Sequence, residues 1–445
     1  MATTFSSLPV EIQRQCVNYL DITALRSMRL SSQAIRDVTT EALFEVATLQ
    51  VTEESAERFS ALMNNDESRR YICRLLLDTH CAGQCAHEEC DVFPPPEWWA
   101  GAVARWSCVS WPNLKKITVD CAYACANRRC ASLGLAFTTF LAGADIEALT
   151  IKHLHDSCLI QRPDFTPGRA KVTKLHLLLT TWSDDASPDN DIEIRYRHSL
   201  FNIHLNTTWL TPLQTQLTHL TLHSNTYWGV YPPWQPGDLH FPRLRSLALG
   251  KWTIAFDWQI DFIVSHSDTL QELFLTNCPI LHALRMTPRQ SDNQWRRPRA
   301  GTARGKPPTN NFFSGLRWHT VLLAFKSKLP KLKYFSMGPG PLGGLVFDRR
   351  DFRDDEAFED RYKLSPRIDS ARYAVFDFGA GPAEWLDGDS EYRQRWHRGK
   401  GGFDGTDWVE KEMDEEVRKK ANYPDCLQED QAALEGLLRS LRERW

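Results

Sequence analysis

The sequence predicts a mixed α/β protein, in which a small three-helix module precedes an irregular solenoid of strands and a helix caps the C-terminal end. Three observations predict this: helical spacing of apolar residues near the N-terminus, a repeated leucine spacing, and one amphipathic helix at the end. With 445 residues, 42% of them hydrophobic, the chain is long enough for several units and a sizeable core. The predicted division is 5–50 for the helical module, 51–70 for a linker helix, 71–340 for the repeat domain and 341–445 for a C-terminal extension.

The helical module is predicted from three short bursts of apolar residues at helical spacing. Pro9 suits a first helical turn, and Thr23 and Ser32 suit the capping positions of the second and third helices. A unit of about forty residues leaves much apolar surface exposed, so we expect it to dock on a partner or on the rest of the chain. An ordinary N-terminal helical cap on a larger domain is the alternative.

A second pattern places apolar residues at positions one, four and six of short segments, and it occurs seven times. Three copies start 27 and 26 residues apart, within the range of leucine-rich repeats, in which each repeat contributes one strand. Other intervals are longer, so we expect long insertions after several strands; a plain α/β domain is the alternative. The copies begin at Leu114, Ile146, Val172, Leu217, Leu244, Leu270 and Leu332.

The insertion at 285–311 differs from the rest of the repeat domain in composition. It holds seven basic residues, one acidic residue and four prolines, and almost no aliphatic ones. Such a segment cannot build a core, so we expect it to be disordered. Its basic run is typical of a nuclear address or a nucleic-acid contact, but a solvated linker is the commoner explanation.

The last eighteen residues predict an amphipathic helix. Its apolar face is expected to cover the open end of the solenoid, because terminal repeats need a cap. The residues of this face are Leu434, Leu437, Leu438, Leu441 and Trp445.

Two cysteine triplets share the spacing Cys-x3-Cys-x4-Cys, and each directly follows a predicted strand. Neighbouring strands would bring the two loops together, and clustered thiolates suit tetrahedral zinc, although the usual Cys-x2-Cys knuckle is absent. Free buried thiols are the commoner explanation, and disulfides between the loops are a third. The triplets are Cys81, Cys85 and Cys90, and Cys121, Cys125 and Cys130.

Charge and composition exclude several classes of partner and reaction. A net charge of −3 gives no field that would recruit nucleic acid or an anionic membrane. No stretch approaches the roughly 20 apolar residues that span a bilayer, and the N-terminus does not read as a signal peptide. We therefore expect a protein of the cytoplasm or nucleus. The sequence has no Gly-x-x-x-x-Gly-Lys phosphate loop, Gly-x-Ser-x-Gly elbow or His-Glu-x-x-His helix. We therefore expect that the protein is not an enzyme and that it requires no cofactor.

The segment LPVEIQRQCVNYLDITALRSMRLSSQAIRDV, residues 8–38, resembles the F-box, the motif that attaches many proteins to the Skp-type adaptor of cullin-based ubiquitin ligases. It departs from that motif at Gln13, Ala24 and Ser31. The remainder is similar to leucine-rich F-box proteins of filamentous fungi. The resemblance implies adaptor contacts by Leu8, Pro9, Ile12, Tyr19, Leu20, Leu25, Met28 and Ile35.

The resemblance also implies a function: a non-catalytic receptor that links a protein substrate, through the adaptor, to a cullin. A scaffold that binds the adaptor without recruiting a cullin is the alternative. Because side chains alternate along a strand, residues between the inward leucines would face a substrate, and aromatic residues after one strand are a second candidate or fill gaps in the core. The candidates are His219, Thr221, His223, Glu272 and Phe274 on strands, and Trp228 and Trp234 in the aromatic segment.

Overall fold

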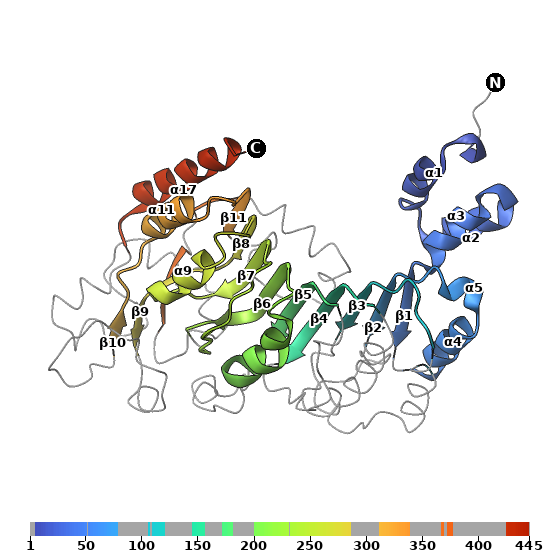
Figure 1. Ribbon diagram of the computed structural model, residues 1–445, viewed down its shortest axis with the longest axis horizontal. Coiled ribbons are helices and arrows are strands. Elements are labelled where there is room, and N and C mark those ends of the chain that lie inside the picture. The colour runs from blue at the N-terminus through green and yellow to red at the C-terminus, as the bar shows by residue number, and fades with distance from the viewer. Residues whose placement is uncertain are drawn as a thin grey trace, which may run out of the picture. The chain divides into compact units, whose positions relative to one another are not determined.

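The structure is a computed structural model (Figure 1). The chain divides into two compact units. Unit 1 comprises residues 1–153 and 160–172, and unit 2 comprises residues 154–159 and 173–445. The residues described are 5–50, 52–78, 106, 109–120, 145–155, 171–180, 200–230, 232–285, 311–338, 366–368, 372–376 and 424–444.

Unit 1 begins with the three helices that the apolar spacing predicts: α1 (Val10–Val17), α2 (Ile22–Ser31) and α3 (Arg36–Phe44). The side chain of Asp21 caps α2 by accepting from the backbone N–H of Ala24 at 2.7 Å. The helices enclose a small core of their own. It consists of buried Val17, Leu25 and Val38, with Phe5, Leu20, Ala42 and Leu43 packed against them.

The rest of unit 1 pairs four parallel strands in chain order: β1 (Val46–Gln50), β2 (Arg74–Asp78), β3 (Lys116–Asp120) and β4 (Ala148–His155), of which the last two residues belong to unit 2. Between β1 and β2 lie α4 (Glu53–Met63) and α5 (Asp66–Arg69), where the sequence predicts a single linker helix over 51–70. β1 occupies the end of the segment 5–50 that was assigned to helices. Its Ala47 and Leu49 alternate inward, and Phe44 precedes them at the spacing of the repeat, but the sequence interpretation assigns Phe44 to the third helix and so passes over this strand.

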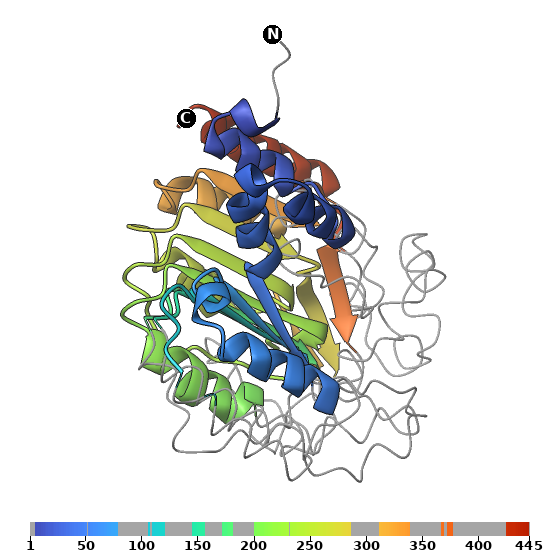
Figure 2. The same ribbon diagram turned by 90° about the vertical axis from the view of Figure 1, so that its right-hand side faces the viewer.

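Unit 2 contains five parallel strands, also in chain order (Figure 2). They are β5 (Lys174–Thr180), β6 (His219–Trp228), β7 (Ser246–Trp252), β8 (Glu272–Thr276) and β11 (Tyr334–Gly338). The repeat positions stand opposite one another across these strands and are buried: Leu175, Leu220, Leu247, Leu273 and Phe335 form one such line. A mixed α/β class and strands at all seven copies of the repeat are thus confirmed.

Helical segments connect the strands of unit 2. A π-helical stretch, η6 (Leu200–Leu210), and the short η7 (Thr211–Leu213) precede β6. The α-helix α9 (Asp257–Val264) follows β7, and α11 (Trp318–Lys328) precedes β11. Among the helices that the structure describes, none is long and apolar enough to cross a membrane.

A second, three-stranded sheet has the order β10-β9-β12. β9 (Ile280–Arg285) pairs antiparallel with β10 (Asn311–Phe313) and parallel with β12 (Tyr373–Phe376). The predicted insertion therefore begins and ends in paired strands, since Arg285 stands opposite Asn311. Its interior, 286–310, lies outside the described residues.

The last helix, α17 (Leu427–Arg442), packs against α11. Leu434, Leu437 and Leu441 are buried, as the amphipathic pattern predicts, and Leu438 is half-buried; Trp445 lies outside the described residues. The two helices run parallel. Asp430, in the first turn of α17, contacts the start of α11. Arg444, just after α17, donates to the carbonyl oxygens of Lys326 and Leu329 at the C-terminal end of α11, at 2.9 and 2.7 Å.

A buried histidine makes the stability of unit 2 depend on pH. Burial, aided by the neighbouring His240, lowers the pKa of His266 to about 4, and the His266 Nε2 accepts from the backbone N–H of Phe241. The unfolded chain takes up this proton below about pH 6.5 while the folded one stays neutral to about pH 4. We expect the free energy of unfolding to fall by up to about 3 kcal/mol between these two pH values, and no contribution from His266 above pH 6.5.

Urea unfolding at pH 7.5 and pH 5, compared between the natural chain and His266→Gln, measures this effect. The variant keeps an acceptor for Phe241 but cannot titrate, so its loss of stability at pH 5 is expected to be smaller. His240→Gln is the comparison variant, because the exposed His240 ring stacks on His266 at 5.0 Å between centroids and is the smaller cause of its lowered pKa; its loss of stability at pH 5 is expected to lie between those of the other two proteins. Equal pH dependence in all three proteins would refute the assignment.

Candidate functional site

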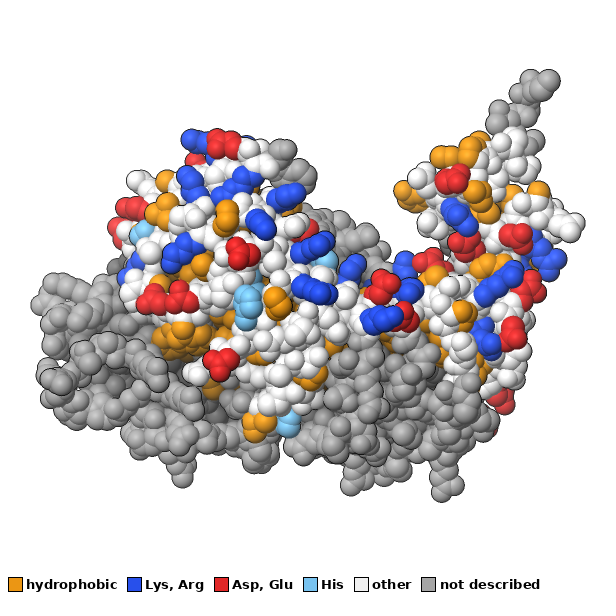
Figure 3. Space-filling view, in the orientation of Figure 1, with side chains coloured by type: hydrophobic (Ala, Val, Ile, Leu, Met, Phe, Trp, Pro, Cys, Tyr) orange, Lys and Arg blue, Asp and Glu red, His pale blue; other side chains and the backbone are white. Residues whose placement is uncertain are grey.

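The N-terminal helices expose a set of large apolar side chains to solvent. Figure 3 shows hydrophobic side chains over α1 and α2. Tyr19 follows the end of α1 and is 90% exposed, and Leu30, near the end of α2, is 86% exposed. Because the module already has a buried core, these side chains are surplus to its own folding. We name them the apolar surface of the module; it consists of Pro9, Val10, Ile12, Tyr19, Ile22 and Leu30.

Local hydrogen bonds hold the start of α1 in place. The carbonyl of Pro9 accepts from the backbone N–H groups of Ile12 and Gln13, both at 3.0 Å. The Gln13 side chain is buried, and its Nε2 donates to the carbonyl of Leu8 at 2.8 Å. At the position of Gln13, the side-chain amide thus forms a hydrogen bond to the preceding turn where an apolar side chain would only pack. Arg14 ties α1 to α3 through an exposed ion pair with Glu41 at 3.0 Å.

The eight predicted adaptor contacts divide into three groups by exposure. Pro9, Ile12 and Tyr19 are exposed, and Leu8, Leu20 and Met28 are half-buried. Leu25 and Ile35 are buried at 8% and 6% exposure, so the interpretation of these two as contacts is corrected: they support the module from within. Sequence reasoning missed Val10, Ile22 and Leu30, because helical periodicity alone does not say which apolar stripe faces the module's own core.

The predicted substrate face of the strands is partly covered. Thr221 and Phe274 are buried, and His219, His223 and Glu272 are half-buried. His223 lies against β7 so closely that a Cβ at Gly250 would be 2.2 Å from its ring. In this structure Thr221 and Phe274 are therefore not available to a substrate.

Trp228 and Trp234 are also unavailable, because both are fully buried. Their rings lie 5.5 Å apart between centroids. Each indole N–H has a partner: Trp228 Nε1 donates to the carbonyl of Gly250 at 2.8 Å, and Trp234 Nε1 donates to Asn206 Oδ1 at 2.7 Å. The gap-filling alternative is correct for this pair, and the interpretation as a binding surface is wrong.

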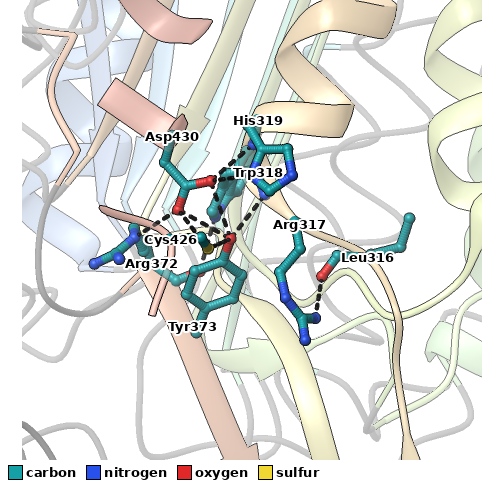
Figure 4. Close-up of polar contacts among 8 residues, drawn as sticks. All are labelled: Leu316, Arg317, Trp318, His319, Arg372, Tyr373, Cys426 and Asp430. Carbon is teal, nitrogen blue, oxygen red and sulfur yellow. Dashed lines mark hydrogen bonds and ion pairs between the residues drawn. The ribbon is translucent and has the colours of Figure 1, made fainter. Parts of the chain in front are cut away.

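A buried polar cluster joins α11, β12 and α17 (Figure 4). Asp430, in the first turn of α17, is fully buried, and its Oδ1 accepts from the backbone N–H of His319 at 2.8 Å. It thereby caps α11, whose first N–H groups have no partner within the helix. The Nε of Arg372, itself 5% exposed, donates to Asp430 Oδ2 at 2.9 Å and balances the charge.

Tyr373 occupies the middle of this cluster. Its hydroxyl lies 3.0 and 3.2 Å from the two oxygens of Asp430 and 3.3 Å from the Sγ of Cys426, and it accepts from the backbone N–H of Trp318 at 2.9 Å. Burial raises the pKa of the Tyr373 phenol, so it stays a neutral donor. Burial also raises the pKa of the Cys426 thiol.

Three groups of this cluster, His319, Cys426 and Asp430, are of metal-ligating type and place their ligand atoms within 4.8 Å of one another. The residues do not fit a cation, however. The Tyr373 hydroxyl contacts two of the three groups, and the Arg372 guanidinium already neutralises the carboxylate. We interpret the cluster as a structural clamp.

The six cysteines of the predicted zinc triplets lie outside the described residues. Within the described part of the chain, Cys16, Cys73, Cys278 and Cys426 are free thiols.

The fold and the exposed helices define a class of protein: an α/β chain with parallel strands and an N-terminal helical module that presents an apolar surface. No protein-family model matches the chain, and a search of curated proteins finds no significant match.

Proposed function

We propose that the chain is the substrate receptor of a cullin-based ubiquitin ligase and that its N-terminal helices bind a Skp-type adaptor. The observation that carries this proposal is the apolar surface of a module that already has its own core. Large exposed apolar patches mark sites of protein interaction in soluble proteins. The F-box resemblance of residues 8–38 covers the same helices and supplies the class of partner.

The energetics of such a contact are adequate. Specific interfaces bury about 1,600 Å² in total and concentrate their binding energy in a few apolar or aromatic side chains. Tyr19 is suited to such a central position, because a tyrosine has a large surface and few torsions to immobilise. The exposed Arg26 and Arg36 would lie at the polar rim, where charges guide association more than they add affinity.

For the remainder of the chain we propose a leucine-rich-repeat-like solenoid that presents the protein substrate. Support comes from the apolar residues that recur in register across the parallel strands, and from α17, which packs on α11 at the C-terminal end. The receptor would perform no chemistry and need no cofactor. It would raise the local concentration of a substrate beside the ubiquitin-conjugating enzyme, so that transfer becomes effectively intramolecular.

Affinity purification of the full chain, with and without a proteasome inhibitor, tests this function in cells. A receptor is expected to bring down both adaptor and cullin, and bound substrates should increase when degradation is blocked. Adaptor without cullin would favour the alternative, a scaffold outside the ligase. Absence of both would contradict the proposal. Imaging of the tagged chain decides between the cytoplasm and nucleus, where these ligases act.

A further inference from the structure

Unit 2 carries an exposed basic region where the C-terminal ends of its two parallel helices, α11 and α17, meet. Figure 3 shows Lys and Arg side chains gathered over these helices. The five basic residues named below are all exposed, and two exposed carboxylates, Glu435 and Glu443, lie among them. We name this region the basic surface; it consists of Lys326, Lys328, Lys331, Arg439 and Arg442.

The packing of the chain brings these residues together. The guanidinium of Arg444 donates to the carbonyl oxygens of Lys326, Leu329 and Leu332, which fixes the end of α17 on the segment after α11. The Lys326 Nζ lies 3.8 Å from where a Cβ on Gly436 of α17 would be. The Lys326 side chain therefore lies against α17, and the other basic residues follow at the same end of the two packed helices.

Pairing distinguishes the basic surface from three exposed basic residues of unit 1. In unit 1, Arg58 lies 3.7 Å from Glu54, Lys115 lies 3.4 Å from Glu147, and Lys171 lies 3.1 Å from Asp145. Within the described ranges, no member of the basic surface has a carboxylate oxygen within 4.0 Å. Glu435 and Glu443 lie beyond this distance, so the five cations outnumber the nearby carboxylates and stay unpaired, which favours an external anion.

Helix dipoles explain only part of the arrangement. Basic residues in the last turn of a helix are stabilised by its partial negative charge, which accounts for Lys326, Lys328, Arg439 and Arg442 individually. Lys331 lies in the loop beyond α11 and gains nothing from being in a last turn. Two more exposed arginines, Arg243 and Arg245, precede β7 at the same edge of the strands. The carbonyl of Arg245 accepts from the backbone N–H of Gln271 at 2.7 Å, and Gln271 directly precedes β8, the strand between β7 and β11.

We propose that the basic surface binds an acidic segment, rich in Asp and Glu, of the protein that the chain recruits. This inference deepens the proposed function by naming the chemistry of the substrate. Binding of the acidic segment does not depend on the proposed function; only the consequence, delivery of a bound protein to the ligase, rests on it. The strand residues first expected to contact a substrate are partly buried, whereas these cations are exposed. A flexible acidic segment fits a set of long, mobile side chains because it needs no preformed pocket.

Fluorescence anisotropy on the purified full chain tests the proposal with a labelled peptide of alternating Glu and Ser. A Gln-for-Glu peptide and a single-stranded RNA of similar length are the comparison probes. We expect the Glu peptide to bind at least tenfold more tightly than the Gln peptide at low salt, and to weaken steeply as salt rises, since screening shortens electrostatic reach. The triple variant Lys326→Gln, Lys328→Gln, Lys331→Gln should lose about tenfold in affinity.

The matched control removes the same charge from paired residues: Arg58→Gln, Lys115→Gln, Lys171→Gln. It is expected to bind the Glu peptide within twofold of the natural chain. Equal binding of the Glu and Gln peptides, or equal losses in the two triple variants, would overturn the proposal. So would tighter binding of the RNA than of the Glu peptide, because the surface would then serve nucleic acid. Adaptor binding, measured separately, distinguishes failure of this inference from failure of the proposed function.

Discussion

Replacing Asp430 by alanine is expected to lower the free energy of unfolding by about 3–5 kcal/mol, the usual cost of removing one partner from a buried ion pair. The carboxylate is the common acceptor for groups from three segments: the backbone of His319, the Nε of Arg372 and the hydroxyl of Tyr373. Without it, Arg372 keeps an uncompensated charge in the core and α11 loses its cap. Urea unfolding followed by tryptophan fluorescence measures the effect, because Trp318 lies in the cluster.

Two further variants sharpen this result. Asp430→Asn keeps the shape of the side chain and one acceptor oxygen. We therefore expect its free energy of unfolding to lie between that of the natural chain and that of the alanine variant. Glu429→Ala, one residue earlier in the same helix, removes an exposed carboxylate and is expected to cost less than about 1 kcal/mol. An Asp430→Ala protein that unfolds at the same urea concentration as Glu429→Ala would show that the cluster is no clamp.

Placing charges on the apolar surface of the module is expected to reduce adaptor affinity at least about 100-fold, since burying two apolar side chains contributes about 3 kcal/mol or more and the new carboxylates would have to be desolvated. The variant is Ile12→Asp with Ile22→Asp, at residues that are 41% and 56% exposed. Titration calorimetry against a purified Skp-type adaptor gives the affinity. Circular dichroism checks that the module stays folded.

The matched control for this variant is Ile203→Asp with Leu323→Asp, at residues of unit 2 that are 55% and 54% exposed. It introduces the same charges at equally exposed apolar positions outside the module, and its adaptor affinity is expected to equal that of the natural chain. A third variant, Leu25→Asp, should lose adaptor binding together with helical structure, because Leu25 lies in the core of the module. Equal loss in the first two variants would mean that general surface charge, and no specific interface, governs binding.

Periodicity predicted the helices and repeat strands well, because each depends on apolar residues near one another in the sequence. Leu217, Leu220 and Leu222, for example, mark one strand by themselves, and all three are buried. β1 was missed because its leading apolar residue, Phe44, is also the last residue of α3, and the segment was read as helix. Exposure was predicted less well: Thr221 and Phe274 alternate with the leucines, as surface residues of a strand would, yet the fold covers them.

The Asp430 clamp lay beyond reach of the sequence pattern for a different reason. Asp430 and His319 are 111 residues apart, and Arg372 is 58 residues from Asp430. Nothing in the local sequence indicates that these residues meet, since β11 and β12 lie between them along the chain. The available signal was that Asp430 continues the apolar stripe of Leu434, Leu437 and Leu441 at helical spacing, a position where an acidic side chain needs a partner.

The central claim, that the N-terminal helices bind a Skp-type adaptor, is tested most directly by mixing the purified full chain with the purified adaptor and measuring the mass of the complex by size-exclusion chromatography with light scattering. The account predicts a single species with the mass of one chain and one adaptor, which separates into its components when Ile12 and Ile22 are both replaced by Asp. Two separate species from the natural chain at micromolar concentrations would contradict it.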